Sequence, residues 1–112
     1  MEKEIIVFSR SAGTLTARIS CEIDHHTAGR LRSRIDRELF VERPRVLCLD
    51  FKDVRFMDSS GIGVVMGRYK QVQYAGGEVY VYGIGKSVDR IFQMSGLYRL
   101  VKEYRMEKEG GN

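Results

Sequence analysis

Residues 45–63 read RVLCLDFKDVRFMDSSGIG. The nearly continuous apolar run at 45–51 predicts a central strand covered on both faces. A loop follows, and the next helix is predicted to begin near Ser59 or Ser60 and to run to about Ala75. The apolar residues of this helix recur at helical spacing: Ile62, Val65, Met66, Tyr69 and Val72. A buried strand joined to an amphipathic helix predicts an α/β fold.

The residues before this unit predict a hairpin and a first helix. An apolar strand over 3–9 and an alternating strand over 14–23 are joined by a short turn, which favours a β-hairpin. The alternating strand places one set of side chains on its apolar face: Leu15, Ala17, Ile19 and Cys21. A helix is predicted over 25–41, with Asp24 as its N-cap. Its buried face is expected to carry Ala28, Leu31, Ile35 and Leu39.

The residues after it predict a further strand and helix. Residues 78–84 form the strand, and residues 86–95 form a short helix that ends at Gly96. The last segment fits a strand that carries Leu100, Tyr104 and Met106, although residues 102–107 could equally be helical. The alternation predicts a mixed β-sheet of four to five strands with helices packed on it, in one domain over residues 1–112.

Composition narrows the class of protein. The chain has 112 residues, 43% of them hydrophobic and 30% charged, and a net charge of +4 without a basic stripe. Direct nucleic-acid binding is therefore not expected. Apolar runs are only a few residues long and the first ten residues lack a signal-peptide pattern, so we expect a cytoplasmic protein with no membrane span. Cys21 and Cys48 are interpreted as reduced core residues.

The segment Asp58-Ser59-Ser60-Gly61-Ile62-Gly63 carries the main candidate site. One serine would suffice to cap the helix, which leaves the other hydroxyl spare beside a helix N-terminus that suits a phosphate. Two glycines here cost helix propensity of roughly 1 kcal/mol each relative to alanine, which favours close approach by another backbone. A simple capping serine is the alternative interpretation.

Three other constellations are weaker. A nucleophile elbow of the form G-x-S-x-G is absent, which argues against a serine hydrolase. Asp24, His25 and His26 lack zinc-ligand spacing, and they are interpreted as a cap followed by surface imidazoles. Residues 83–87 (GIGKS) lack the spacing of a phosphate-binding P-loop, and Gly85 is interpreted as a helix cap. We expect no metal and no cofactor.

Three segments together carry a resemblance to a known family. Residues 56–70 (FMDSSGIGVVMGRYK) closely resemble the phosphorylation segment of the STAS-domain anti-sigma factor antagonists, and the likeness is nearest to the sporulation sigma-F branch. Residues 22–28 (EIDHHTA) resemble that family's junction between its second strand and first helix. Residues 92–97 (FQMSGL) resemble the end of its third helix. The likeness extends over about residues 14–101.

The resemblance implies a regulatory protein rather than an enzyme. It implies that Ser59 is phosphorylated by an anti-sigma factor kinase that uses ATP, that only the unphosphorylated form binds this kinase and frees the sigma factor, and that a serine phosphatase restores it. The implied partner surface comprises Asp24, Thr27, Asp58, Ser59, Ser60, Gly61 and Gly63. We expect the free protein to be a monomer.

Two alternatives are compatible with the same segments. The first is a partner-switching STAS protein that serves another anti-sigma kinase, such as that of a general-stress pathway. The second is a STAS-like module that binds a nucleotide or lipid and is never phosphorylated. The spare serine argues against the second alternative.

Overall fold

A computed structural model of the chain describes residues 4–104, which share one five-stranded sheet and one buried core. The order of elements is the predicted one, with a short 3-10 turn added near the end. The elements are β1 (Ile6–Ser11), β2 (Thr14–Ile19), α1 (Ala28–Glu42), β3 (Val46–Asp50), α2 (Ser60–Tyr74), β4 (Glu78–Tyr82), α3 (Lys86–Ser95), η1 (Leu97–Arg99) and β5 (Lys102–Tyr104).

The strands lie side by side in the order of the chain. β1 pairs antiparallel with β2, and β2, β3, β4 and β5 then pair parallel to one another. Ala12 and Gly13 connect the first two strands, with φ of 49° and 83°. Two consecutive positive φ values give a turn whose twist matches that of the flanking strands. The predicted hairpin and the mixed sheet are therefore confirmed.

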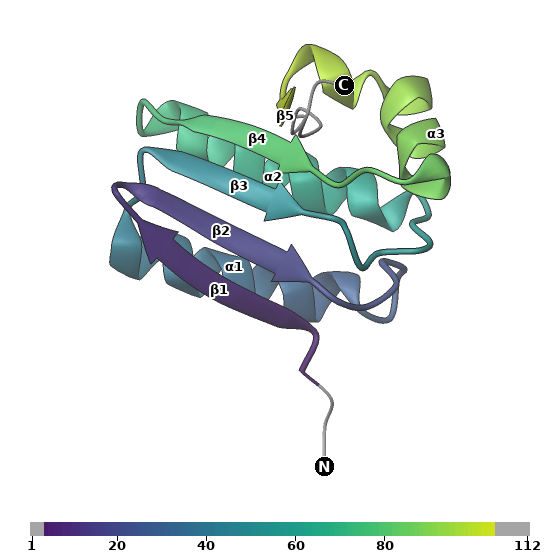
Figure 1. Cartoon of the computed structure of the whole chain (residues 1–112), viewed down its shortest axis with the longest axis horizontal. Helices are drawn as coiled ribbons and strands as arrows, with labels where there is room; N and C mark the ends of the chain where they lie inside the picture. The colour runs from purple at the N-terminus through teal and green to yellow at the C-terminus, as the bar shows by residue number, and fades with distance from the viewer. Residues whose placement is uncertain (1–3, 105–112) are drawn as a thin grey trace, which may run out of the picture.

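This sequential order decides which face of the sheet is covered. Because right-handed crossovers that all advance in one direction place their helices on the same face, α1 and α2 both lie behind the sheet in Figure 1. The prediction that the central strand is covered on both faces is therefore wrong. Leu47 and Leu49 of β3 face the helices and are buried, whereas Val46 and Cys48 face the other way and are only half-buried.

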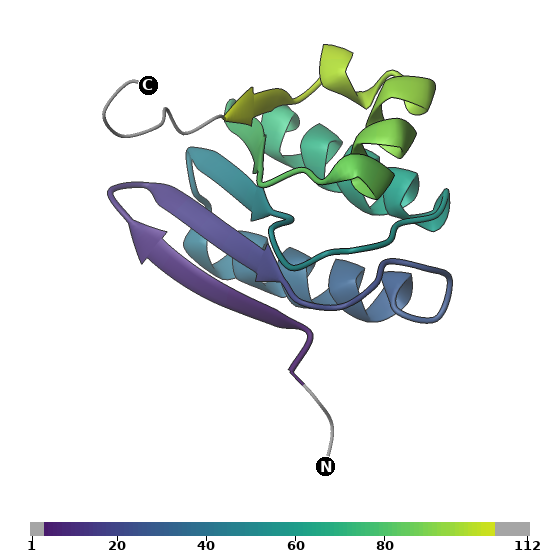
Figure 2. The same ribbon diagram turned by 45° about the vertical axis from the view of Figure 1, so that its right-hand side comes forward.

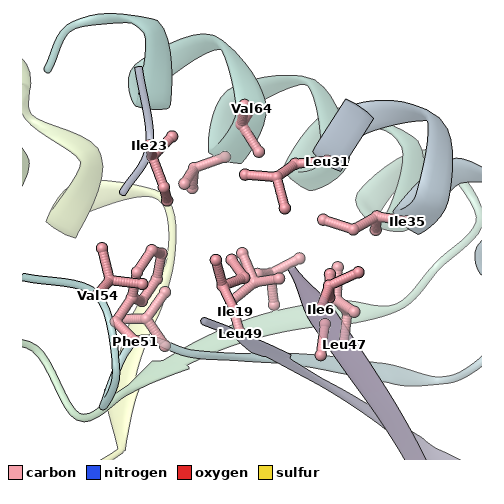
Figure 3. Close-up of a cluster of buried hydrophobic side chains, with 14 of the residues drawn as sticks. Ile6, Ile19, Ile23, Leu31, Ile35, Leu47, Leu49, Phe51, Val54 and Val64 are labelled. Carbon is pink, nitrogen blue, oxygen red and sulfur yellow. The ribbon is translucent and has the colours of Figure 1, made fainter. Parts of the chain in front are cut away.

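The core lies between the sheet and these two helices. Figure 3 shows Ile6, Ile19, Leu47 and Leu49 pointing from the strands towards the helices. Leu31 and Ile35 of α1 and Val64 of α2 meet them from the other side. The predicted buried face of α1 is confirmed, since its buried residues are Ala28, Leu31, Ile35 and Leu39.

The buried face of α2 differs from the prediction. Ile62, Met66 and Tyr69 are only partly buried, whereas Val64 and Arg68 are buried. The buried face includes three residues at four-residue spacing: Val64, Arg68 and Val72. A search for apolar residues at helical spacing misses this series because arginine is charged. Arg68 is nevertheless buried, with only 6% of its surface exposed, because its side chain lies between α2 and α1.

Several predicted boundaries also shift. The second strand ends at Ile19 rather than at residue 23, and the first helix begins at Ala28 rather than at His25. The third helix has the predicted bounds, and Gly96 follows it with φ of 79°. Residues 102–104 form a strand, β5, and not the helix that was the alternative for residues 102–107. Met106 lies outside the described residues. Cys21 and Cys48 are both free, and burial raises the pKa of each thiol.

Helix α3 and η1 lie beyond β4, at the side of the sheet opposite β1 (Figure 2). Val88 and Phe92 fix α3 to the core. The ring of Phe92 stands edge-on to that of Phe51, with centroids 5.5 Å apart, and lies 5.2 Å from that of Tyr98. These ring contacts make Phe92 the main anchor of α3.

Removing this anchor is expected to destabilise the whole fold. Phe92→Ala should lower the free energy of unfolding by about 3–5 kcal/mol, because it deletes a fully buried ring and leaves a cavity. Met94→Ala on the same helix is the control, since Met94 is 77% exposed. That variant should change stability by less than about 0.5 kcal/mol. Urea unfolding measures both, and equal effects would contradict this packing.

Candidate functional site

The two segments that carry the candidate residues lie side by side. The Ile23 N–H donates to the Phe56 carbonyl and the Asp58 N–H donates to the Ile23 carbonyl, each at 3.0 Å. Ile23 and Met57 thus form a parallel bridge beyond the ends of β2 and β3, and both side chains are buried. Asp24 directly follows one bridged residue and Asp58 directly follows the other. The bridge therefore brings together the segments that lead into α1 and α2.

Asp58 provides the side-chain cap at the start of α2. Its Oδ1 accepts the Ser60 N–H at 2.7 Å, and its carbonyl accepts the Gly61 N–H at 3.0 Å. Ser59 occupies the N-cap position, but its side chain makes no capping hydrogen bond. The prediction that one of the two serines caps this helix is therefore wrong, because the carboxylate that precedes them reaches the free N–H first.

The hydroxyl of Ser59 is consequently available for chemistry. Ser59 is exposed, and within residues 4–104 its Oγ takes part in no hydrogen bond. A substituent on this oxygen would project from the helix N-terminus into solvent. It would leave the capping hydrogen bond of Asp58 in place.

Asp24 and Thr27 form a second capping arrangement. The Asp24 N–H donates to Thr27 Oγ1 at 3.1 Å, and Asp24 Oδ1 accepts the N–H groups of His26 at 2.9 Å and of Thr27 at 3.1 Å. The Thr27 hydroxyl also donates to the Glu22 carbonyl at 2.7 Å. This reciprocal bonding resembles a capping box, placed one turn before the helix. The prediction that Asp24 is the N-cap of α1 is therefore wrong, because Thr27 occupies that position.

These hydrogen bonds also set the charge of Asp24. Partial desolvation opposes ionisation, but the two backbone N–H groups outweigh it and lower the pKa of Asp24 below its ordinary 3.8. Because folding lowers this pKa, ionised Asp24 stabilises the fold above that value, and the contribution is lost as the pH falls through the folded-state pKa. Asp24 is an anion at neutral pH.

The two predicted glycines have different reasons to be glycine. A Cβ on Gly61 would lie 2.4 Å from Met57 Cγ and Sδ, so Gly61 is required by the buried methionine beneath it. A Cβ on Gly63 would meet no atom within 4 Å. Close approach by another molecule is therefore a candidate reason for Gly63 alone.

The structure also places the weaker candidates. His25 and His26 are exposed with ring centroids 4.0 Å apart, and no metal-binding group of three side chains occurs among the described residues. Gly85 is the N-cap of α3, as predicted. Gly83 has φ of 73°, and a Cβ there would lie 2.9 Å from the Lys52 nitrogen, so packing accounts for this glycine. Over residues 4–104, none of the helices has the length and apolar character needed to span a bilayer.

Comparison with known proteins identifies the family. A family model described as the STAS domain matches residues 6–110. The anti-sigma F factor antagonist of Paenibacillus polymyxa is 39% identical over 95 residues, which cover 85% of this chain and 81% of that protein. The chain belongs to the anti-sigma factor antagonists of the STAS family. This confirms the resemblance carried by residues 56–70.

Two further antagonists match over most of their length. The anti-sigma-B factor antagonist of Bacillus subtilis (strain 168) is 32% identical over 93 residues, which cover 83% of each chain. The solved structure of the anti-sigma factor antagonist SpoIIAA in its unphosphorylated form has a TM-score of 0.78 and 27% identity, and the match covers 93% of this chain and 90% of that one. The predicted STAS fold is thereby confirmed.

The different surroundings of Gly61 and Gly63 predict opposite effects for two alanine substitutions in this antagonist. Gly63→Ala should raise the free energy of unfolding by about 0.5–1 kcal/mol, because it improves helix propensity in open space. Gly61→Ala should lower it by about 1–3 kcal/mol, because the buried side chain of Met57 must shift. Thermal unfolding of the two variants provides the measurement. Stabilisation by Gly61→Ala would show that Met57 does not constrain this position.

Proposed function

We propose that this antagonist is the phosphorylation-controlled component of a partner switch. The unphosphorylated form binds an anti-sigma factor that is a serine kinase with bound ADP or ATP, and this binding releases the sigma factor. Phosphorylation of Ser59 abolishes binding, and a serine phosphatase restores it. The observation that carries the proposal is the exposed hydroxyl of Ser59, which lies at the start of α2 while Asp58 supplies the cap.

A phosphate on Ser59 is compatible with the fold as it stands. The group adds about −1.5 to −2 charges at neutral pH. At the N-terminus of α2 this charge gains about 0.3–1 kcal/mol from the helix dipole, and the rest of the group is solvated. No element of the fold has to move to accommodate it.

The same phosphate is incompatible with a tight protein contact. In the complex it would lose its water beside Asp58 and close to Asp24, both of which carry the same sign of charge. Burying an unpaired charge costs several kcal/mol, even before this repulsion is added. A loss of about 3 kcal/mol weakens binding by more than a hundredfold. Local electrostatics is therefore sufficient for the switch.

The proposed partner surface surrounds this hydroxyl. It comprises Asp24 and Thr27 from the segment before α1, and Asp58, Ser59, Ser60 and Gly63 from the start of α2. Gly61 belongs to the surface indirectly, since it is buried and lets Met57 pack beneath the helix.

The favoured partner is an anti-sigma F factor, which would place the protein in sporulation. The 39% identical relative is an antagonist of that factor, whereas the 32% identical relative is an antagonist of anti-sigma-B factor. A sigma-B type partner is the second candidate because the same segments match both classes. We place either switch in the cytoplasm.

Phosphorylation is expected on Ser59 and not on Ser60. The wild type should gain one phosphate when it is incubated with ATP and the anti-sigma F factor of Paenibacillus polymyxa. Peptide mapping by mass spectrometry then locates this phosphate. Ser60→Ala should be phosphorylated equally, since Ser60 contributes its backbone N–H and not its hydroxyl to the cap. Ser59→Ala should remain unmodified. A phosphate found on Ser60, or none with either sigma-F or sigma-B type kinases, would refute the proposal.

In the proposed switch, a negative charge at position 59 weakens binding of the anti-sigma factor without unfolding the protein. As a second readout, Ser59→Asp should melt within about 10 °C of the wild type, which corresponds to roughly 2 kcal/mol for a domain of this size. It should nevertheless bind the anti-sigma factor poorly. A larger fall in melting temperature would indicate a conformational switch instead of a local electrostatic one.

Asp24 is expected to contribute its charge to the partner as well as its hydrogen bonds to the fold. Asp24→Asn keeps an oxygen that can accept the His26 and Thr27 N–H groups, so the melting temperature should be preserved. The charge is lost, and binding measured by calorimetry with ADP should weaken by roughly 2 kcal/mol. Glu22→Gln, at an exposed carboxylate in the same segment, is the control and should bind normally. Unchanged affinity of Asp24→Asn would assign Asp24 a purely structural role.

A further inference from the structure

Helices α1 and α2 pack side by side, and Asp36 of α1 makes polar contacts with two residues of α2. Asp36 Oδ1 lies 2.9 Å from Arg68 Nε and accepts a hydrogen bond from Gln71 Nε2 at 2.9 Å. Because side chains four apart share one face of a helix, Arg32 of α1 lies on this same face, one turn nearer the start of the helix. Gly67 of α2 precedes Gln71 by one turn in the same way. Both therefore line the contact on the side that leads towards Ser59.

The positive charge along this contact exceeds the negative charge. Arg68 is 6% exposed, and its Nε and Nη1 make no hydrogen bond within the described part of the chain, because the ion pair with Asp36 lacks hydrogen-bond geometry. Asp36 is its one ion-pair partner there, and Gln71 shares that carboxylate. Burial lowers the pKa of Arg68, Asp36 opposes this, and the positive charge of Arg32 adds to the lowering.

Arg32 itself has no carboxylate within 4.0 Å in residues 4–104. It is exposed, and its guanidinium folds back towards the start of α1, where Nη2 lies 3.7 Å from the position of a Cβ on Gly29. The contact thus holds two guanidinium groups and one carboxylate, which pairs with Arg68. Within residues 4–104, Arg32, which is the cation nearer to Ser59, has no anion beside it.

Glycines keep the surface around Arg32 low. Cβ atoms on Gly63 and Gly67 would meet nothing within 4 Å, and one on Gly29 would meet only Arg32. Each of these glycines lies in a helix, where it costs roughly 1 kcal/mol relative to alanine. We call the surface formed by Gly29, Arg32, Ser60, Gly63 and Gly67 the α1–α2 seam. It starts beside the proposed phosphoacceptor, Ser59, and ends at Gly67, which lies about 12 Å further along α2 at 1.5 Å per residue.

We propose that the α1–α2 seam is a second contact surface for the anti-sigma factor, and that Arg32 binds a carboxylate of that partner there. This inference rests on the proposed function, and it extends the proposed contact beyond the segments around Ser59. The occupant is an acidic segment of the anti-sigma factor, since an exposed guanidinium with no anion pairs best with a carboxylate in a bidentate geometry. Because Gly63 and Gly67 have no side chains, that segment can approach the backbone of α2.

The test compares charge reversal at two exposed arginines of α1. Arg32 faces the seam, whereas Arg37 lies five residues further on and faces away from α2. Arg32→Glu and Arg37→Glu are titrated against the anti-sigma F factor of Paenibacillus polymyxa with ADP present, using the full chain. Arg32→Glu should weaken binding roughly thirtyfold, which is about 2 kcal/mol, and Arg37→Glu should bind within about twofold of the wild type. Both variants should melt within about 3 °C of the wild type, because both side chains are exposed.

The outcomes separate this inference from the proposed function. If the wild type binds, Ser59→Asp does not, and Arg32→Glu binds as well as Arg37→Glu, the seam is not a contact surface although the switch exists. Equal weakening by both reversals would indicate a general effect of net charge and would also overturn the assignment of Arg32. A wild type that fails to bind anti-sigma F and anti-sigma-B factors alike would overturn the proposed function, and this inference with it.

Discussion

The two backbone hydrogen bonds that join Ile23 to Phe56 and Asp58 set the geometry on which the rest of the candidate site depends. They continue the parallel pairing of β2 and β3 after both strands have ended. The two helices that follow therefore start next to each other and run in the same direction across one face of the sheet. Buried Ile23 and Met57 fix this bridge from below, so the positions of the exposed residues above it are inherited from the core.

The chemistry of the site follows from a division of labour among neighbouring polar residues. At both helix starts an aspartate carboxylate accepts backbone N–H groups. Thr27 uses its hydroxyl within the fold, as both donor and acceptor. Ser59 is left with an exposed hydroxyl that takes part in no hydrogen bond within residues 4–104, so the proposed phosphate would break no interaction of the fold there. The same two aspartates make the surroundings unfavourable for a buried phosphate.

The α1–α2 contact adds a second electrostatic feature to this arrangement. A buried guanidinium is costly unless it is paired, and Asp36 supplies the pairing for Arg68. Among residues 4–104, Arg32, one turn away from Asp36, has no carboxylate partner. The negative charges of Asp24 and Asp58 and the positive charge of Arg32 therefore lie along one continuous surface. A partner that matches both signs gains specificity as well as affinity, because a partner with the opposite arrangement would be repelled at each end.

The sequence by itself determined the order of the elements, the hairpin, the bounds of α3 and the location of the candidate site. These features rest on local physics: hydrophobic periodicity, turn residues that tolerate positive φ, and a glycine after a helix. Only the tertiary structure decided that helices cover one face of the central strand, because this follows from the order of strands in the sheet. It also decided that Asp58 caps α2, that α1 begins at Ala28, and that Arg68 is buried. Each of these depends on which groups from distant segments meet, and periodicity within one segment carries no information about such encounters.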